Sequence, residues 1–226
     1  MLNSTSFFCL CLVLSTGVFG DTDEVKSVSV TEGDSVSLNT DVRVQRDDMV
    51  LWMFGPKESR IADIHRHNIY IDATYTIFEK RLQMDNQTGS LTIRNIRSEH
   101  TGLYKLLILR NRGNSYKRFS VSVYAPLPIP IISSNSSNCS SSSSSVSNCS
   151  LLCSAVNVSA VTLSWYKGNS LLSSISVSDL SISLSLPLEV EYQENNTYSC
   201  VINNPITNQT THLDITQLCH TCPGIT

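Results

Sequence analysis

CSAVNVSAVTLSW, residues 153–165, begins with a cysteine and ends with Trp165, twelve residues later. Its last part alternates apolar and polar residues, which predicts a β-strand with one buried face. Further along, Tyr198 stands two residues before Cys200. A cysteine, a tryptophan and a second cysteine with such a tyrosine before it are typical of two antiparallel sheets packed face to face. A Cys153–Cys200 disulfide would then join the two sheets over Trp165.

The first half of the chain has a tryptophan and a corner tyrosine in the same order, but other residues stand at the two cysteine positions. VSLNT, residues 36–40, ends with Thr40 where the first cysteine would stand, and Trp52 is the matching tryptophan. TGLYKL, residues 101–106, places Tyr104 as the corner tyrosine and Leu106 at the second cysteine position. Packing around Trp52 must therefore replace the covalent link in this half.

Short alternating runs recur along the whole chain, and no stretch shows helical periodicity. Examples in the two halves are Leu91 and Ile93, and Ile182, Leu184 and Leu186. We therefore expect an all-β protein of two tandem immunoglobulin-like β-sandwiches: a variable-type domain without the inter-sheet disulfide, then a C2-type domain with disulfides. The expected boundaries are a signal peptide at 1–20, the variable-type domain at 21–125, a Pro/Ser linker at 126–138, the C2-type domain with a Ser-rich insert at 139–218, and a tail at 219–226.

Several features predict export from the cell. The first twenty residues have an apolar core, and the small residues Val18 and Gly20 precede a cleavage point before Asp21. Six cysteines follow this leader, an even number that favours disulfides. Asn-x-Ser/Thr triplets predict glycosylation at Asn86, Asn135, Asn138, Asn148, Asn157, Asn195 and Asn208. We expect an extracellular protein, either secreted or on the outer side of the plasma membrane, with no anchor in this sequence.

The composition argues against several functions. The formal net charge is -3 and no basic tract occurs, which disfavours nucleic acid as the partner. His65 and His67 alternate on an expected edge strand without further ligands, and Cys219 and Cys222 are spaced as in redox or zinc motifs but lie in an exported chain. No nucleophile elbow or phosphate loop is present. We expect no catalytic residue, no metal, no cofactor and no small-molecule substrate, and therefore not an enzyme.

The chain resembles the SLAM family of lymphocyte receptors and its T-cell adhesion relatives. The residues that carry the resemblance are RLQMD (81–85), TGSLTI (88–93), TGLY (101–104), CSLLC (149–153) and Cys219. The resemblance implies a Cys149–Cys219 disulfide beside Cys153–Cys200, and it is closest to the short ligand-type members without a signalling tail. Cys139 is then left to pair with Cys222, or either cysteine to bridge to another chain. His100 departs from the family pattern, where an Asp pairs with an Arg near strand D, so Arg81 is expected to lack that partner.

The resemblance also implies a binding surface, the GFCC′C″ face of the first domain. Side chains alternate along a strand, so core positions at Trp52, Tyr104 and Phe119 send their neighbours outward. The expected ligand face is Met49, Leu51, Met53, Lys105, Leu107, Leu109, Tyr116 and Arg118. The strand around residues 61–65 is expected to contribute too. The alternative is that the C′–C″ edge covers some of these side chains.

The function implied is that of an immune-cell adhesion or recognition ligand, or a co-receptor ectodomain. Its partner would be another immunoglobulin-superfamily receptor on a neighbouring cell, or a second copy of itself. Two alternatives remain: a secreted decoy that uses the same face, and an adhesion protein of the carcinoembryonic-antigen type, whose first domain also lacks the cysteines. Cys149 and Cys219 weigh against the latter.

Overall fold

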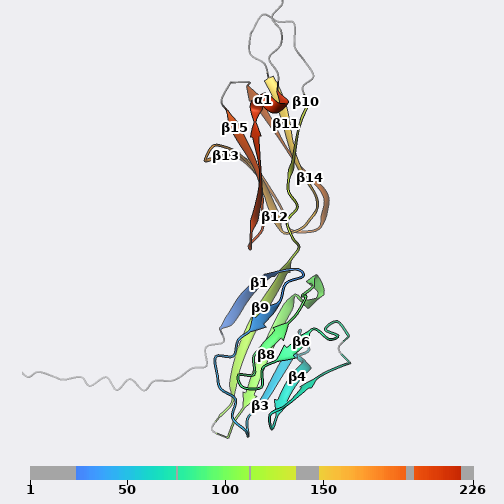
Figure 1. Cartoon of the computed structure of the whole chain (residues 1–226), viewed down its shortest axis with the longest axis vertical. Coiled ribbons are helices and arrows are strands. Elements are labelled where there is room, and N and C mark those ends of the chain that lie inside the picture. Colours follow the sequence, from blue (N-terminus) through green and yellow to red (C-terminus); the bar gives the residue numbers. More distant parts are fainter. Residues whose placement is uncertain (1–23, 75, 112, 136–147, 192–195, 220–226) are drawn as a thin grey trace, which may run out of the picture.

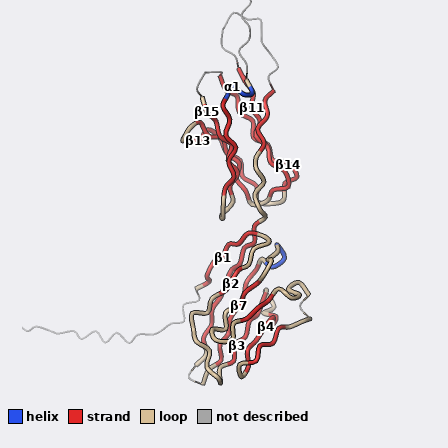
Figure 2. The backbone as a smooth tube through the Cα atoms, viewed as in Figure 1, coloured by secondary structure: helices blue, strands red, loops and turns tan. Residues whose placement is uncertain are grey.

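The computed structural model describes residues 24–74, 76–111, 113–135, 148–191 and 196–219. The expected signal peptide, most of the Ser-rich insert, Cys139, Cys222 and the sequons at Asn138 and Asn195 lie outside these residues. Figure 1 shows two β-sandwiches placed end to end, and Figure 2 shows that strands make up almost all of their regular structure. The all-β tandem fold is therefore confirmed.

The first sandwich consists of a six-stranded and a three-stranded sheet. The larger sheet has the order β1-β9-β8-β3-β4-β5, and the smaller one has the order β2-β7-β6. Strand β1 pairs with β9 in parallel, whereas every other pairing in this sandwich is antiparallel. The strands are β1 Val25–Thr31, β2 Val36–Leu38, β3 Met49–Phe54, β4 Ser59–His65, β5 Asn68–Ile71, β6 Leu82–Met84, β7 Leu91–Ile93, β8 Gly102–Leu109 and β9 Ser115–Tyr124, with a 3₁₀ turn at Ser98–His100.

The second sandwich packs a three-stranded sheet, β10-β11-β14, against a four-stranded sheet, β13-β12-β15-β16. All of its pairings are antiparallel. Its elements are β10 Ile131–Asn135, β11 Asn148–Val158, β12 Val161–Lys167, β13 Ser170–Val177, β14 Ser181–Glu191, β15 Thr197–Asn203, β16 Asn208–Asp214 and the short helix α1 Ile215–Leu218.

The two disulfides expected in the second domain are present. Cys153 of β11 and Cys200 of β15 link the two sheets, with their Cα atoms 6.3 Å apart. Cys149 is joined to Cys219 directly after α1, at a Cα separation of 5.9 Å. The cysteines, Trp165 and surrounding aliphatic side chains form one buried cluster. Covalent links and a small apolar core therefore hold this domain together.

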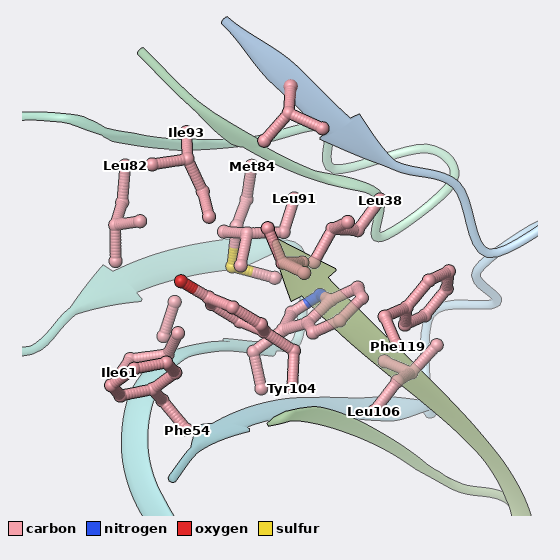
Figure 3. Close-up of a cluster of buried hydrophobic side chains, with 14 of the residues drawn as sticks. Leu38, Phe54, Ile61, Leu82, Met84, Leu91, Ile93, Tyr104, Leu106 and Phe119 are labelled. Atoms are coloured by element: carbon pink, nitrogen blue, oxygen red, sulfur yellow. The ribbon is translucent and has the colours of Figure 1, made fainter. Parts of the chain in front are cut away.

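The core of the first domain uses the same arrangement without the disulfide (Figure 3). The indole N–H of Trp52 donates to the Gly89 carbonyl at 2.8 Å, as that of Trp165 donates to Leu186 in the second domain. Leu106 lies opposite Trp52, as Cys200 lies opposite Trp165. Thr40, the other cysteine position, is fully buried, and its hydroxyl donates to the Thr88 carbonyl.

Gly89 is required by this arrangement. Its φ is +72°, and a Cβ there would approach the Val50 side chain to 3.1 Å. A residue without a Cβ adopts this conformation at little steric cost and brings its carbonyl within reach of the indole. The turn before β7 thereby fixes the position of the core tryptophan.

The corner tyrosine and His100 form one buried polar group in the first domain. The Tyr104 hydroxyl donates to the His100 carbonyl at 2.8 Å, and burial raises the pKa of this hydroxyl. The His100 ring accepts the backbone N–H of Arg97 at 2.8 Å and stacks on Phe78 at 5.0 Å. Its Nε2 lies 2.7 Å from the Ile77 carbonyl, so Nε2 carries the proton. His100 therefore serves as a neutral structural residue.

Arg81 bonds to a backbone carbonyl where the family pattern would supply an aspartate. Its guanidinium donates through Nη1 to the Asn95 carbonyl at 2.8 Å, while its buried Nε has no hydrogen-bond partner.

Two expectations about strands need correction. Strand β2 ends at Leu38, so Thr40 lies just beyond it, because its hydroxyl and amide bond to the 88–90 turn instead. Ile182 continues the alternation of Leu184 and Leu186 but is 78% exposed. Next to Ile182, β11 departs from regular pairing at Asn157, whose φ is +53°, so the alternation of buried side chains is interrupted there and Val158 is the next buried residue.

Candidate recognition face

The outer face of the six-stranded sheet is the surface on which the sequence places the binding residues. Strands β9, β8, β3, β4 and β5 correspond to G, F, C, C′ and C″ and lie side by side. Paired residues of neighbouring strands point to the same side of a sheet. The register therefore sorts the outward side chains into three rows that run across the strands.

The central row is mainly apolar and aromatic. Leu107 lies opposite Leu51 on one side and Tyr116 on the other. Leu51 in turn lies opposite Asp63, and Asp63 opposite Tyr70. The two leucines are half-buried, whereas Tyr116 and Tyr70 at the two ends are 44% and 55% exposed. The centre of the face is thus a leucine pair between two tyrosines.

A basic row lies on the linker side of the central row, since β9 runs toward the linker. Lys105 is paired with Arg118 and with Met53, and Met53 lies opposite Arg60. The ammonium group of Lys105 donates to both carboxylate oxygens of Glu58 at 2.9 Å. It also lies 5.7 Å from the centre of the Tyr116 ring, within cation–π range.

The third row lies toward the tip of the domain. It pairs Leu109 with Met49, and Met49 with His65. Beside it, the Arg110 guanidinium donates through Nε to Asp48 at 3.2 Å, and the same carboxylate oxygen accepts the Gln45 amide at 2.9 Å. This row therefore continues the apolar centre and borders a fixed ion pair.

Asp63 is the buried charge of the face. It is only 5% exposed, and a carboxylate in that setting requires a partner. The guanidinium of Arg60 supplies one through Nη1 at 3.2 Å.

A second ion pair lies on the opposite side of the sheet. Lys117 of β9 points to that side and pairs with Asp41, where its hydrogen bond and positive charge lower the pKa of the Asp41 carboxyl.

All eight residues of the expected ligand face have the expected outward parity. Seven are half-buried or exposed, and Met53 is buried at 9% exposure, outside the main core cluster. The alternation that started from Trp52, Tyr104 and Phe119 therefore gave the right side of the sheet for each residue. Their role in binding remains a prediction.

The sequence did not reveal which side chains β4 and β5 place on the outer face. Strand β4 contains a bulge: Ala62 pairs with Trp52 and Arg60 with Met53, which leaves Ile61 without an opposite residue. Ile61 and Ala62 are consequently both buried, and simple alternation fails. Asp63 and Tyr70 reach the face only through this shifted register. A bulge has no reliable signal in a single sequence.

The hairpin between β4 and β5 carries the two histidines considered as metal ligands. His65 and His67 are exposed, and Arg66 and His67 adopt positive φ angles in the turn. Within the described residues, no group of three or more His, Cys, Asp or Glu side chains is arranged to hold a metal ion. The described part also contains no helix long and apolar enough to cross a membrane.

Comparison with known proteins identifies the type of the first domain. Residues 23–124 match the family model of the immunoglobulin V-set domain. The crystal structure of the CD2-binding domain of CD58, lymphocyte function-associated antigen 3, is similar over 89% of this chain and 100% of its own, with a TM-score of 0.64 and 18% identity. Residues 23–124 therefore form a V-set domain, and the chain as a whole shares the fold of this structure.

Two further structures share the fold. Bovine butyrophilin aligns over 84% of this chain and 95% of its own, with a TM-score of 0.62 and 12% identity. Murine CEACAM1b aligns over 82% and 94%, with a TM-score of 0.57 and 14% identity. At these identities the likeness concerns the fold alone. No curated protein matches this chain by sequence.

Proposed function

We propose that this chain is the ectodomain of an immune-cell adhesion or recognition protein of the SLAM type, and that its outer face binds a related immunoglobulin-type receptor. The observation that carries the proposal is the central row. Leu51 and Leu107 are partly accessible and flanked by Tyr116 and Tyr70. Apolar residues within an aromatic and charged surround are the composition of protein interfaces, and tyrosine is enriched among their energetically dominant residues.

The distribution of sequons supports the same face. Asn86 is the only Asn-x-Ser/Thr site between residues 21 and 125. It is exposed in the turn between β6 and β7, which belong to the other sheet. A glycan there would leave the outer face accessible to a partner.

The charge of the face indicates the kind of partner. Arg60, Lys105 and Arg118 lie in one row, with Glu58 and Asp63 as the acidic groups beside them. A second copy would bring the same basic row, and its Glu58 and Asp63 would already be paired with its own Lys105 and Arg60. We therefore propose a heterophilic partner with an acidic face, since complementary charge speeds association and selects partners. CD58, whose structure is that of a CD2-binding domain, is one structural neighbour that fits this proposal.

Surface plasmon resonance with the full mature chain tests this function. The chain would be passed at micromolar concentrations over itself and over a panel of SLAM-type ectodomains from the same organism. We expect saturable binding to one of them that weakens as salt is raised. Arg118→Glu should weaken it further, whereas Arg43→Glu, on an exposed loop beside the other sheet, should not.

Two results would overturn parts of the proposal. Binding of a folded chain to none of the panel would exclude the SLAM-type function. Saturable binding to itself alone would replace the heterophilic partner by a homophilic one.

A further inference from the structure

We propose that a hollow between β5 and β6 of the first domain binds the first sugar of an N-linked glycan on Asn86, and that this sugar stabilises the domain. The hollow has a volume of about 360 Å³, at the lower end of the range for ligand pockets, which suits one sugar ring. Asn86 begins an acceptor triplet and is itself part of the wall. The complete lining is Ile69, Gln83, Met84, Asp85, Asn86 and Thr92.

The hollow lies on the side of the first sandwich where both sheets end. Strand β5 is the last strand of the six-stranded sheet, and β6 is the last strand of the three-stranded sheet. Ile69 of β5 pairs with the fully buried Ile64, so its side chain points to the inner side of the sheet. Ile69 is nevertheless 39% exposed, since no strand of the described chain closes the sandwich between β5 and β6.

The lining suits a ligand with an apolar face and a polar rim. Ile69 and Met84 supply apolar contacts, and Gln83 and Asp85 supply polar groups. The Arg94 guanidinium donates to the side-chain oxygen of Gln83, which leaves the Gln83 amide nitrogen as a donor for a ligand oxygen. A sugar ring has the same division, because its C–H groups form an apolar surface and its hydroxyl and N-acetyl groups form hydrogen bonds.

The turn that carries Asn86 is held in place by backbone hydrogen bonds. The Gly89 amide donates to the Asp85 carbonyl at 2.7 Å, and the Asp85 amide donates to the Ser90 carbonyl at 3.0 Å. The Asp85 carboxylate also accepts the Thr88 amide at 2.9 Å. A sugar on Asn86 is therefore tethered at a fixed point in the wall, and its binding avoids most of the loss of translational and rotational freedom that a free sugar would suffer.

The attachment uses a lipid-linked oligosaccharide diphosphate as donor. The side-chain amide nitrogen of Asn86 forms a bond to C1 of the first sugar and loses one proton. The bond from C1 to the diphosphate oxygen breaks, and the lipid diphosphate leaves with that electron pair. No oxidation or reduction takes place.

The sugar would connect the two sheets of a domain that has no disulfide. No cysteine occurs between residues 21 and 138, so packing alone holds these sheets together. Ile69 belongs to the six-stranded sheet and Gln83 to the three-stranded sheet. A sugar in contact with both side chains removes the exposed apolar surface of Ile69 from water, which is favourable, and adds a link between the sheets at their open side.

The test uses the full chain secreted by mammalian cells whose N-glycans are kept in the high-mannose form. Glycopeptide mass spectrometry measures occupancy at Asn86. Calorimetry compares the intact protein, the protein trimmed by an endoglycosidase that leaves one N-acetylglucosamine on each asparagine, and Asn86→Gln. The transition that reductant does not shift belongs to the first domain, which contains no cysteine. If Asn86→Gln is not secreted, complete enzymatic removal of the glycan from the folded protein replaces it.

A second pair of variants tests whether the glycan uses the hollow. Ile69→Ser removes the apolar part of the lining. Ile206→Ser makes the same change in the second domain, at an isoleucine that is also 39% exposed, and is the matched control. Each change is combined with Asn86→Gln, and hydrogen exchange of residues 68–71 is measured by mass spectrometry.

We expect Asn86 to be occupied and the intact and trimmed proteins to melt at the same temperature. Asn86→Gln should melt about 4 °C lower and exchange faster at residues 68–71. This loss should fall by at least half in the Ile69→Ser background and stay unchanged in the Ile206→Ser background. An unoccupied Asn86, an Asn86→Gln variant that melts with the wild type, a trimmed protein that melts like Asn86→Gln, or an equal loss in both isoleucine backgrounds would overturn the proposal.

Discussion

At the scale of single residues, His100 shows how a departure from a family pattern is accommodated. The ring fills the space beside Phe78 and makes hydrogen bonds through both nitrogens. Sequence reasoning identified the departure but not its consequence, because the ring's partners are two backbone groups, one of them 23 residues away.

Replacing this ring should be costly. We expect His100→Ala to lower the free energy of unfolding of the first domain by about 2–4 kcal/mol, since it leaves a cavity and unpaired buried backbone groups. Urea unfolding followed by tryptophan fluorescence measures this. His67→Ala, on an exposed turn, is the control and should change little. A loss below about 1 kcal/mol for His100→Ala would show that the ring is not a structural residue.

The correspondence of Thr40 and Leu106 with Cys153 and Cys200 gives a second prediction at this scale. The indole N–H of each tryptophan donates to a backbone carbonyl, and the residue opposite the tryptophan is Leu106 in the first domain and Cys200 in the second. Thr40→Cys with Leu106→Cys should therefore form a disulfide in oxidising conditions, and closing a loop of this length contributes about 4 kcal/mol relative to the reduced form.

Mass spectrometry without reductant detects the bond, and thermal unfolding with and without reductant gives its effect. Thr40→Cys alone serves as the control for the loss of the buried hydroxyl. Two free thiols in a folded double variant would contradict the proposed equivalence of Thr40 and Leu106 with Cys153 and Cys200.

At the scale of elements, alternation along a strand was the most informative signal. It placed Leu107 and Lys105 on the correct side of β8 because regular antiparallel strands have a period of two. It failed where the period is interrupted, at the β4 bulge and at Asn157 in β11. Both interruptions come from backbone geometry that depends on the neighbouring strand, so they could not be predicted from the chain's own pattern.

The turn between β6 and β7 has a titratable residue, Asp85, at its centre. The Asp85 carboxylate accepts the amides of Gln87 and Thr88 at 2.7 and 2.9 Å. These bonds, that of Thr88 foremost, lower the pKa of Asp85 in the folded chain. The unfolded chain then binds the proton more readily, so the stabilisation is present above the ordinary pKa of about 3.9 and is lost as the pH falls through the folded value.

Asp85→Asn should therefore lower stability at neutral pH and reduce the loss of stability on acidification. Thermal unfolding midpoints of the two proteins between about pH 6 and pH 2 measure this, below and above the ordinary Asp range. The gap between the midpoints should narrow toward the acid end. A constant gap would show that the carboxylate charge does not contribute.

At the scale of the whole molecule, two separate cores explain why a tandem fold could be predicted from sequence. Each half has its own tryptophan, corner tyrosine and buried cluster. The junction is tied by few polar contacts: the Thr211 hydroxyl donates to the Pro130 carbonyl at 2.6 Å, and the Asn204 amide to the Ala125 carbonyl at 3.5 Å. These contacts join residues about 80 positions apart and have no sequence signature.

The claim that the outer face is a recognition surface is tested most directly by one pair of variants on the partner found in the binding screen. Leu107→Asp places a charge at the centre of the face, and Leu171→Asp makes the same change at a 57% exposed position of the second domain. The measurement is the equilibrium dissociation constant by surface plasmon resonance, with circular dichroism to verify folding. The account predicts at least a tenfold loss, about 1.4 kcal/mol, for Leu107→Asp and none for Leu171→Asp. Equal affinities for the wild type and folded Leu107→Asp would contradict it.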